Sequence, residues 1–529
     1  MTKKEEMMDK IIYITTPIYY VNDVPHIGHA YTTIAADVLA RYYRAHGMNV
    51  HFLTGTDEHG QKIEDSAKKK GVDPKTFTDE IAQAFKELWN ALNISNNDFI
   101  RTTDDKHVRT VQEIFKKLYD KEDIYKGEYE GWYCVHCETY YPETDLNEGK
   151  ECPDCKRPLS QVKEDAYFFN LSKYEDKLLK YYEDNPEFMM PVFRGNEMKN
   201  FIKNGLKDLC VTRKKVKWAI PVPFDEEHTV YVWFDALINY ISAINFIGDK
   251  NAEKKFENYW PCDIHFIGKE IFKFHTIIWP AMLFALGLEP PKKVFGHGWW
   301  TVEGNKMSKS VGNVVDPRDV IKEYNGNEDV LRYFVLREVP FGSDGDFSHT
   351  GLEQRYNSEL ANDLGNLFSR VLNMIGKYAD GIVPDKSISG GALITKAQES
   401  GERYETSMGK ADFYKALIYI WELISEANKY VEDRAPWKLA KNEVSREELK
   451  QVLFDLAAVL ALVARFLFPF MPKTAKKMWS QLGLQCLEKE INIAVKAGEK
   501  PIIDWKQIMK NRKIGNIESL FPRKEKNDN

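Results

Sequence analysis

Two histidines near the start of the chain are separated by one apolar residue and a glycine, as His26-Ile27-Gly28-His29. A stretch with helical periodicity follows from 30 to 46, so the pair is expected where a helix begins. A helix N-terminus offers unpaired N–H groups and a positive dipole end to an anion. Gly28 permits close approach of a ligand, and both imidazoles can donate hydrogen bonds to phosphate oxygens. Alone, the tetrapeptide is weak evidence, because two histidines also meet at a turn by chance.

A second stretch contains two lysines, Lys306-Met307-Ser308-Lys309-Ser310, with Gly304 before it and Gly312 after it. Glycines on both sides predict a mobile loop. Lysines on such a loop can close over a triphosphate and hold the departing pyrophosphate. Taken alone, a solvated basic loop explains the same residues equally well.

Four of the seven cysteines form two C-x-x-C pairs, Cys134 with Cys137 and Cys152 with Cys155. This spacing lets four thiolates converge on one tetrahedral ion and leaves no open coordination position. We therefore predict one structural Zn²⁺ per chain, which stabilises a small insertion that lacks a core of its own. A pair of redox dithiols is the alternative interpretation.

Alternating strand and helix signals position these residues. The runs 11–16 and 50–54 are typical of buried strands, and with the helix between them they predict a βαβ unit in a parallel sheet. Strand-like runs return at 230–234 and 264–268, and a helical segment follows at 272–286. From 355 onward the pattern is almost wholly helical, with breaks at 384–391 and 432–436, which predicts a helix bundle.

The predicted fold class is therefore α/β, a Rossmann-like parallel-sheet catalytic domain with a zinc-knuckle insertion, followed by an all-α helix bundle. The expected parts are the first half of the nucleotide-binding domain, the insertion, the second half of that domain, a linking segment and a helical domain, at residues 1–120, 121–229, 230–325, 326–354 and 355–529.

Composition sets wider limits. Hydrophobic residues make up 43% of the 529, enough for sizeable cores, and the net charge is −6, so no global basic character indicates a nucleic-acid partner. We find no signal peptide and no apolar run long enough to span a membrane. An odd number of cysteines without an export signal does not suggest a disulfide framework, so we expect a cytoplasmic protein.

Together, the two motifs in this order and in these α/β contexts resemble the class I aminoacyl-tRNA synthetases, whose fold carries a HIGH motif and then a KMSKS motif. Within that class the chain is similar to the methionyl-tRNA synthetases at 15–22, 54–60, 232–240 and 265–279. The resemblance implies ATP-dependent attachment of L-methionine to tRNA(Met), including the initiator tRNA. The reaction would pass through methionyl-adenylate, use Mg²⁺ with ATP, and release AMP and pyrophosphate.

By position, the resemblance also implies the site residues. The catalytic set comprises His26, Gly28, His29, Lys306 and Lys309. The ATP-binding set comprises His26, His29, Gly268, Lys269, His297, Gly298 and Lys309. The methionine pocket comprises Ile18, Tyr20, Asp57, Trp233, Ala236, Tyr240, His275 and Trp279.

In this pocket Asp57 would hold the substrate ammonium, and rings would contact the polarizable thioether. Core packing is the alternative reading of each ring. Leu237 stands where many members carry proline, and Glu270 where some carry aspartate, which affects the expected fine geometry of the pocket. The resemblance further implies that Asn366, Arg370 and Trp437 read the CAU anticodon, although Arg370 also fits an ordinary surface and Trp437 a cap on the bundle.

Other class I synthetases, for leucine, valine or cysteine, are the nearest alternatives. The insertion at 121–229 is too short for the large editing domain of the leucine and valine enzymes. The cysteine enzyme binds zinc in its pocket, whereas four thiolates here would hold zinc elsewhere. A non-catalytic RNA-binding paralogue and a short nucleotidyltransferase are further alternatives. No appended dimerising module is visible, so a monomer is expected.

Overall fold

The computed structural model describes residues 11–22, 24–134, 139–141, 146, 151–153, 156–214, 216–248, 256–307, 313–484 and 509–522. The chain forms two compact units, each assembled from segments far apart in sequence. The first unit contains Met1–Pro25, Val50–Asn90 and Ser95–His297, and the second contains His26–Asn49, Ala91–Ile94 and Gly298–Asn529. The domain boundaries expected from the sequence stay a prediction.

The first unit is built on a parallel sheet, as the sequence predicts. Its strand order is β3-β2-β1-β12-β13-β7, and every neighbouring pair is parallel. The strands are β1 (Ile12–Tyr20), β2 (Val50–Asp57), β3 (Asp98–Arg101), β7 (Met189–Met190), β12 (Ile264–Gly268) and β13 (Val294–His297).

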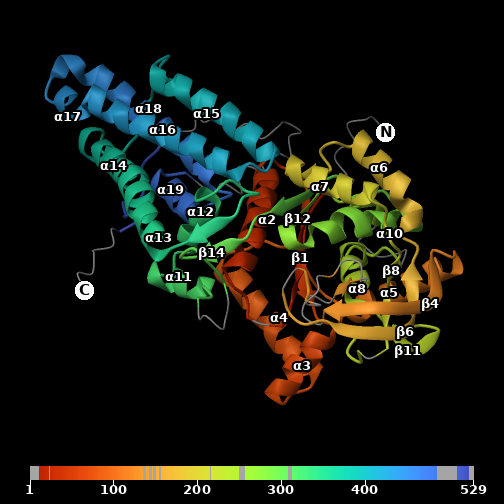
Figure 1. Cartoon of the computed structure of the whole chain (residues 1–529). Helices are drawn as coiled ribbons and strands as arrows, with labels where there is room; N and C mark the ends of the chain where they lie inside the picture. Colours follow the sequence, from red (N-terminus) through yellow and green to blue (C-terminus); the bar gives the residue numbers. More distant parts are fainter. Residues whose placement is uncertain are drawn as a thin grey trace. The chain divides into compact units, whose positions relative to one another are not determined.

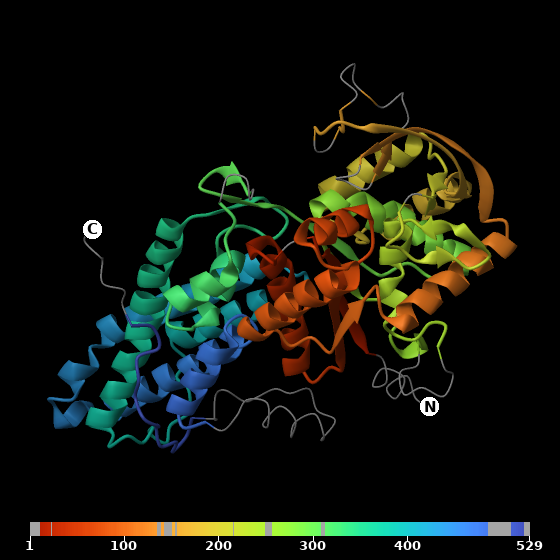
Figure 2. The ribbon, with the colours of Figure 1, turned by 90° about the horizontal axis from the view of Figure 1, so that it is seen from below.

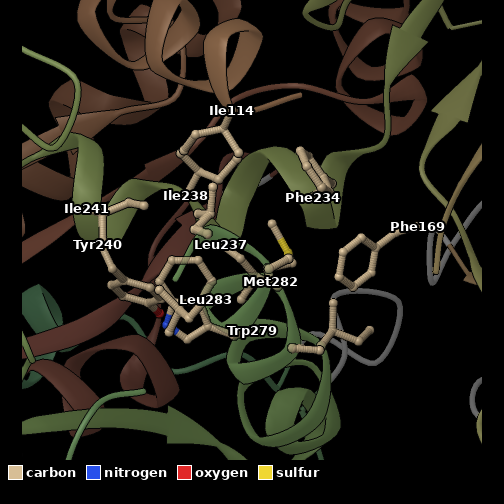
Figure 3. Packing of buried hydrophobic residues seen from close by; sticks show 14 of the residues in the cluster. Ile114, Phe169, Phe234, Leu237, Ile238, Tyr240, Ile241, Trp279, Met282 and Leu283 are labelled. Carbon is tan, nitrogen blue, oxygen red and sulfur yellow. The ribbon is translucent and has the colours of Figure 1, made fainter. Parts of the chain in front are cut away.

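Helices of the first unit follow or connect these strands. They are α3 (Gln61–Lys70), α4 (Pro74–Ala91), α5 (Asp105–Asp120), α6 (Glu175–Asp184), α7 (Val192–Lys203), α8 (Val232–Leu237), α9 (Asn239–Ser242) and α10 (Trp279–Leu286), with a π-helical turn at Phe274–Ile278. Rings and aliphatic side chains of these helices form one buried cluster, which includes Phe234, Leu237, Tyr240 and Trp279 (Figure 3).

The insertion predicted at 121–229 contains antiparallel sheets. One has the order β5-β4-β6-β8, formed by β4 (Ile124–Cys134), β5 (Thr139–Tyr141), β6 (Ser160–Phe169) and β8 (Leu209–Cys210). The long pair β4 and β6 is visible in both views (Figures 1 and 2). A smaller sheet joins β9 (Thr212–Arg213), β10 (Pro221–Val222) and β11 (Asp225–Val230).

The second unit is mainly helical, which confirms the predicted helical C-terminal region. Helices α14, α15, α16 and α18 pack side by side (Figure 1). The helices are α2 (Ile27–Ala45), α11 (Pro317–Glu323), α12 (Glu328–Arg337), α13 (His349–Arg355), a π-helix (Tyr356–Asn366), α14 (Leu367–Tyr378), α15 (Ala392–Gly409), α16 (Phe413–Arg434), α17 (Pro436–Leu439), α18 (Arg446–Leu467) and α19 (Pro472–Gln481). A small sheet contains β14 (Trp300–Val302), β15 (Asn305–Lys306) and β16 (Gly345–Phe347).

Two local expectations were wrong. The run 230–234 is not a strand, because β11 ends at Val230 and α8 begins at Val232. The apolar run 230–234 thus crosses from the end of β11 into a buried helix, and periodicity alone does not distinguish such a run from a buried strand. The first strand also extends beyond the predicted run 11–16, because β1 continues through Pro17 to Tyr20, with a shift of register against β2 between Thr15 and Ile18. In the part of the chain that the structure describes, no helix is long and apolar enough to cross a membrane.

Candidate active site

The histidine pair caps α2, and backbone hydrogen bonds fix both rings. The Gly28 N–H donates to His26 Nδ1 at 3.1 Å, and the His26 N–H donates to His29 Nδ1 at 3.1 Å. The rings stack with centroids 3.9 Å apart. Because each Nδ1 accepts a hydrogen bond, each neutral ring carries its hydrogen on Nε2. Burial lowers the pKa of His29 well below its ordinary value, and the neighbouring His26 adds a smaller effect in the same direction. This shift favours the neutral form of His29.

Gly28 leaves room for this arrangement. A Cβ at this position would lie 3.0 Å from His26 Cε1 and 3.8 Å from Met307 Cε, so a side chain would crowd the ring. The Ile27 N–H also donates to the Val315 carbonyl at 3.1 Å. The structure therefore brings the start of α2 beside residues that flank the lysine-rich stretch. Lys306 lies in β15, whereas Lys309 lies outside the described residues.

A buried ion pair holds α2 within the second unit. Asp37 accepts from Arg41 Nε at 2.8 Å and from Arg332 Nη2 at 2.7 Å, and the side chains of Asp37 and Arg332 are fully buried. The Arg332 guanidinium also donates to the carbonyls of Phe470 and Pro469 at 2.9 Å each, and of Leu92 at 3.2 Å. One guanidinium thus joins α2 to α12 and to the segment that precedes α19.

In the first unit, adjacent strands carry Asp57, the residue expected to hold the methionine ammonium, and Tyr20, a residue expected to line the side-chain pocket. Tyr20 and Asp57 are register partners at the carboxyl ends of β1 and β2. Asp57 is buried, and Lys62 lies over the Tyr20 ring at 5.6 Å. Ile18 is half-buried and packs against the main hydrophobic cluster. Parallel strands place their carboxyl ends at one edge of the sheet, where α/β proteins bind ligands.

Three further pocket candidates meet through hydrogen bonds and ring contacts. Tyr240, His275 and Trp279 are all almost fully buried. His275 Nδ1 lies 3.0 Å from the Ile271 carbonyl and therefore donates to it, which leaves Nε2 to accept from the Tyr240 hydroxyl at 2.8 Å. Burial lowers the pKa of His275 to about 4, although the hydrogen bond to Ile271 opposes that shift. His275 is therefore neutral near pH 7.

A buried carboxylate, Asp235, anchors the segment that carries Trp233 and Ala236. Asp235 accepts from His59 Nδ1 at 2.7 Å and from His107 Nε2 at 2.6 Å. Burial acts to raise the pKa of Asp235, but the two histidines outweigh it and hold that pKa below its ordinary value. Trp233 stacks on Phe274 with centroids 3.8 Å apart. Ala236 is buried.

Two of the glycines expected to bind ATP have close neighbours, a side chain at Gly268 and backbone at Gly298. A Cβ on Gly268 would lie 2.4 Å from a Glu270 carboxylate oxygen, and a Cβ on Gly298 would lie 2.2 Å from the Ser343 carbonyl. Gly268 and the buried His297 are register partners at the ends of β12 and β13. Lys269 follows directly and is half-buried.

Two of the three anticodon candidates are brought into contact. The Arg370 guanidinium carbon lies 5.0 Å from the Trp437 ring centroid, and Nη1 forms an ion pair with Glu432 at 2.7 Å. Asn366 ends the π-helix that precedes α14 and donates to Asn362 at 2.9 Å. Trp437 follows Ala435, whose φ of 39° ends α16 and turns the chain into α17. This pair places a cation beside an aromatic ring, a combination that proteins use to bind single-stranded nucleic acids.

Of the predicted zinc ligands, Cys134 and Cys152 are described and belong to one small buried cluster with Leu146 and Leu159 packed against it. A backbone turn follows Cys152, whose N–H donates to the Arg157 carbonyl at 2.8 Å. Cys137 and Cys155 lie outside the described residues. One cysteine of each pair therefore comes to the same place.

Several buried polar residues escaped the sequence analysis. They are His265, the Asp235 group and the pair of Arg332 with Asp37. The i,i+4 spacing of Asp37 and Arg41 was a usable signal, because such residues share one face of a helix. Asp235 and His107 are 128 residues apart, and Thr15 and His265 are 250 residues apart, so no local pattern connects these partners.

Comparison with known proteins agrees with this geometry. A family described as tRNA synthetases class I (M) matches residues 12–372, and the anticodon binding domain of methionyl tRNA ligase matches residues 384–497. A methionine–tRNA ligase of Caldanaerobacter subterraneus subsp. tengcongensis is 55% identical over 480 residues, which cover 90% of this chain and 74% of that protein. The Clostridium perfringens methionine–tRNA ligase is 49% identical over 527 residues, 98% of this chain and 81% of that protein.

Solved structures give the same result. Mycobacterium tuberculosis methionyl-tRNA synthetase in complex with methionyl-adenylate superposes with a TM-score of 0.91 at 37% identity, and the match covers 97% of this chain and 100% of that chain.

Proposed function

This chain belongs to the methionyl-tRNA synthetases of class I, and from that premise we propose that it activates L-methionine with ATP and transfers it to tRNA(Met), initiator tRNA included. The observation that carries the proposal is the buried Tyr240–His275 pair among aromatic rings in the first unit; the second unit, described by itself, holds the histidine cap of α2. Neither feature by itself names both substrates.

In the first proposed step, a methionine carboxylate oxygen attacks the α-phosphorus of ATP. The bond to the bridging oxygen breaks, pyrophosphate leaves and methionyl-adenylate forms. His26 and His29 donate through Nε2–H to phosphate oxygens, where negative charge builds in the transition state. Lys306 and Lys309 neutralise the departing pyrophosphate, and Mg²⁺ accompanies ATP. Positioning and charge stabilisation suffice, so no side chain acts as a nucleophile.

Methionine is selected in the pocket of the first unit. Asp57 receives the ammonium beside Tyr20, and the rings of Trp233, Tyr240 and Trp279 contact the thioether. Sulfur against aromatic rings gains about 0.3–1.5 kcal/mol per contact. A purely apolar pocket discriminates poorly between side chains of similar size, so the polar Tyr240–His275 pair supplies discrimination against leucine. Ile18, Ala236 and the backbone around them complete the wall.

In the second proposed step, a ribose hydroxyl of the terminal tRNA nucleotide attacks the adenylate carbonyl, and AMP leaves. Gly268, Lys269, His297 and Gly298 hold the nucleotide portion of the adenylate until then. Trp437 stacks on a splayed anticodon base, and Arg370 and Asn366 read base edges. The contact of Arg370 with Trp437 supports this assignment.

Amino-acid-dependent exchange of pyrophosphate into ATP tests the proposal. We expect exchange with methionine, and charging of tRNA(Met) in a second assay. Exchange with leucine, valine or cysteine but not methionine would overturn the substrate assignment. Absence of exchange with every amino acid would indicate a non-catalytic RNA-binding protein instead.

We further propose that Cys134, Cys137, Cys152 and Cys155 hold one Zn²⁺. Burial of Cys134 and Cys152 in one cluster, beside a tight turn, supports a site with four thiolates. The ion would supply folding free energy to the insertion and take no part in the reaction. Metal analysis should find about one zinc per chain. Purified, active protein without zinc would contradict this assignment and leave the enzymatic proposal intact.

We also expect a cytoplasmic monomer. The substrates ATP and tRNA support the compartment, and light scattering during size-exclusion chromatography measures the oligomeric state.

A further inference from the structure

His265 lies behind the proposed methionine pocket and contacts it on two sides. The residue is fully buried on β12, where it is the register partner of Thr15 on β1. Its ring stacks on Tyr240 with centroids 4.1 Å apart. Its Nε2 lies 3.3 Å from the indole Nε1 of Trp279. His265 therefore contacts two rings that line the proposed pocket, although it is not itself one of the residues expected to line that pocket.

The hydrogen-bonding partners of His265 fix its tautomer. An indole N–H can only donate, so His265 Nε2 must accept from Trp279. The single hydrogen of the neutral imidazole is therefore on Nδ1, which donates to Thr15 Oγ1 at 2.7 Å. Burial lowers the pKa of His265 well below its ordinary value, and the nearby His275 adds a smaller effect in the same direction. Both effects favour a neutral ring. The orientation of the ring is thus set from the sheet.

Tyr240 is held from three directions. Its ring lies on His265, its hydroxyl donates to His275, and its backbone carbonyl accepts from the Tyr13 hydroxyl at 2.8 Å. Trp279 lies beside Tyr240, with centroids 5.9 Å apart, in the same buried cluster (Figure 3). A change at His265 therefore affects both rings at once.

We propose that His265 is a positioning residue for methionine recognition, which holds the indole of Trp279 through its Nε2 and the ring of Tyr240 through its face. Thr15 locks the imidazole in the orientation that makes both contacts possible. This role rests on the proposed function, because it assumes that Tyr240 and Trp279 line the amino-acid pocket. In this proposal, His265 contributes to selectivity for the thioether although its side chain is not part of the pocket wall.

Two substitutions separate the acceptor from the ring. His265→Phe keeps an aromatic face for Tyr240 but leaves the buried indole N–H of Trp279 without an acceptor. A buried donor without a partner is costly, so the KM for methionine should rise about 10- to 100-fold in pyrophosphate exchange, with the KM for ATP unchanged. His265→Gln places an amide oxygen near the position of Nε2 and should restore much of the affinity.

A double-mutant cycle with Trp279→Phe tests the contact itself. Removal of the indole N–H makes the acceptor unnecessary, so His265→Phe should add no more than about 2-fold to the KM for methionine in that background. His228→Phe is the matched control, because His228 is also fully buried in the first unit but contacts Asp165 and Asp225 instead. It should leave the KM for methionine unchanged.

The outcomes are distinguishable. Wild-type protein without methionine-dependent exchange would contradict the proposed function itself. Normal wild-type exchange with an unchanged KM for methionine in folded His265→Phe protein, checked by its melting temperature, would overturn only the role of His265. Equal effects of His228→Phe and His265→Phe would also overturn it, since they would indicate general destabilisation. If His265→Phe fails to fold, the KM values of His265→Gln and of Thr15→Val decide: the first should stay near wild type and the second should rise.

Discussion

The two halves of the proposed active site are organised over very different sequence distances. At the phosphate end, the rings of His26 and His29 are oriented by backbone N–H groups within the same four residues. In the amino-acid pocket, Thr15 orients His265 from 250 residues away, and Tyr13 holds Tyr240 from 227 residues away. One half uses the geometry of a helix N-terminus, and the other uses the packing of a core.

This difference predicts different responses to substitution. Hydrogen bonds to a phosphate strengthen as charge builds, so changes at the histidine cap should reduce kcat. Contacts with a methionine side chain are the same before and during the reaction, so changes in the pocket should raise KM. The buried ion pair of Arg332 with Asp37 is an exception to this difference, because a residue far away in the sequence stabilises the helix whose N-terminus carries the histidine cap.

Arg332→Leu is the strongest test of how local the phosphate end is. The substitution removes one partner of buried Asp37 and three hydrogen bonds to backbone carbonyls, so it should destabilise the second unit by about 3–5 kcal/mol. Urea unfolding measures this loss. Lys116→Ala, which breaks an exposed pair with Asp120, should cost no more than about 1 kcal/mol. Equal small losses for both variants would show that α2 needs no distant support.

His29→Asn tests the role of the phosphate end in the chemistry. Asparagine can still accept from the His26 N–H, but it lacks the donor at Nε2, so kcat for pyrophosphate exchange should fall about 10²- to 10³-fold with little change in the KM for methionine. His46→Asn, at the other end of α2, should have no such effect. A rise in the KM for methionine at unchanged kcat would contradict the division between the two halves.

His275→Gln tests the pocket through pH. The folded-state pKa of His275 is about 4 and its ordinary value is 6.5, so the unfolded chain binds a proton first as pH falls. Stability is therefore lost as pH falls from 6.5 to about 4, by about 3 kcal/mol from this residue. The substitution should make the loss of stability between pH 7.5 and 4.5 smaller. An unaltered pH profile of stability in His275→Gln would contradict the assignment of a neutral buried ring.

Trp437→Ala should have the smallest effect and should separate tRNA recognition from both halves. Loss of one stacking surface weakens tRNA binding by about 1–3 kcal/mol, seen as a higher KM for tRNA in charging assays. Pyrophosphate exchange without tRNA should remain at the wild-type rate. Val444→Ala, in the same bundle at a residue 91% exposed, is the control. A parallel loss of exchange in Trp437→Ala would indicate a general folding defect.

Much of the fold followed from local patterns. The first βαβ unit, β12 and the helical C-terminal region were predicted because strand and helix periodicities are properties of a few consecutive residues. The same rule failed at 230–234, where a continuous apolar run crosses from the end of β11 into the buried start of α8. Environment rather than sequence periodicity determines such a segment.

The sequence by itself indicated a phosphate-binding motif at His26–His29, because a helix cap needs only neighbouring residues to orient two histidines. It also indicated the family, and it predicts a metal site. The tertiary structure alone decided which side chains support the pocket. Burial and partners contributed by distant segments determine three features: the neutral state of His265, the nitrogen of His275 that accepts a hydrogen bond, and the ion pair of Arg332 with Asp37. Those are properties of the packed core, and no short stretch of sequence contains them.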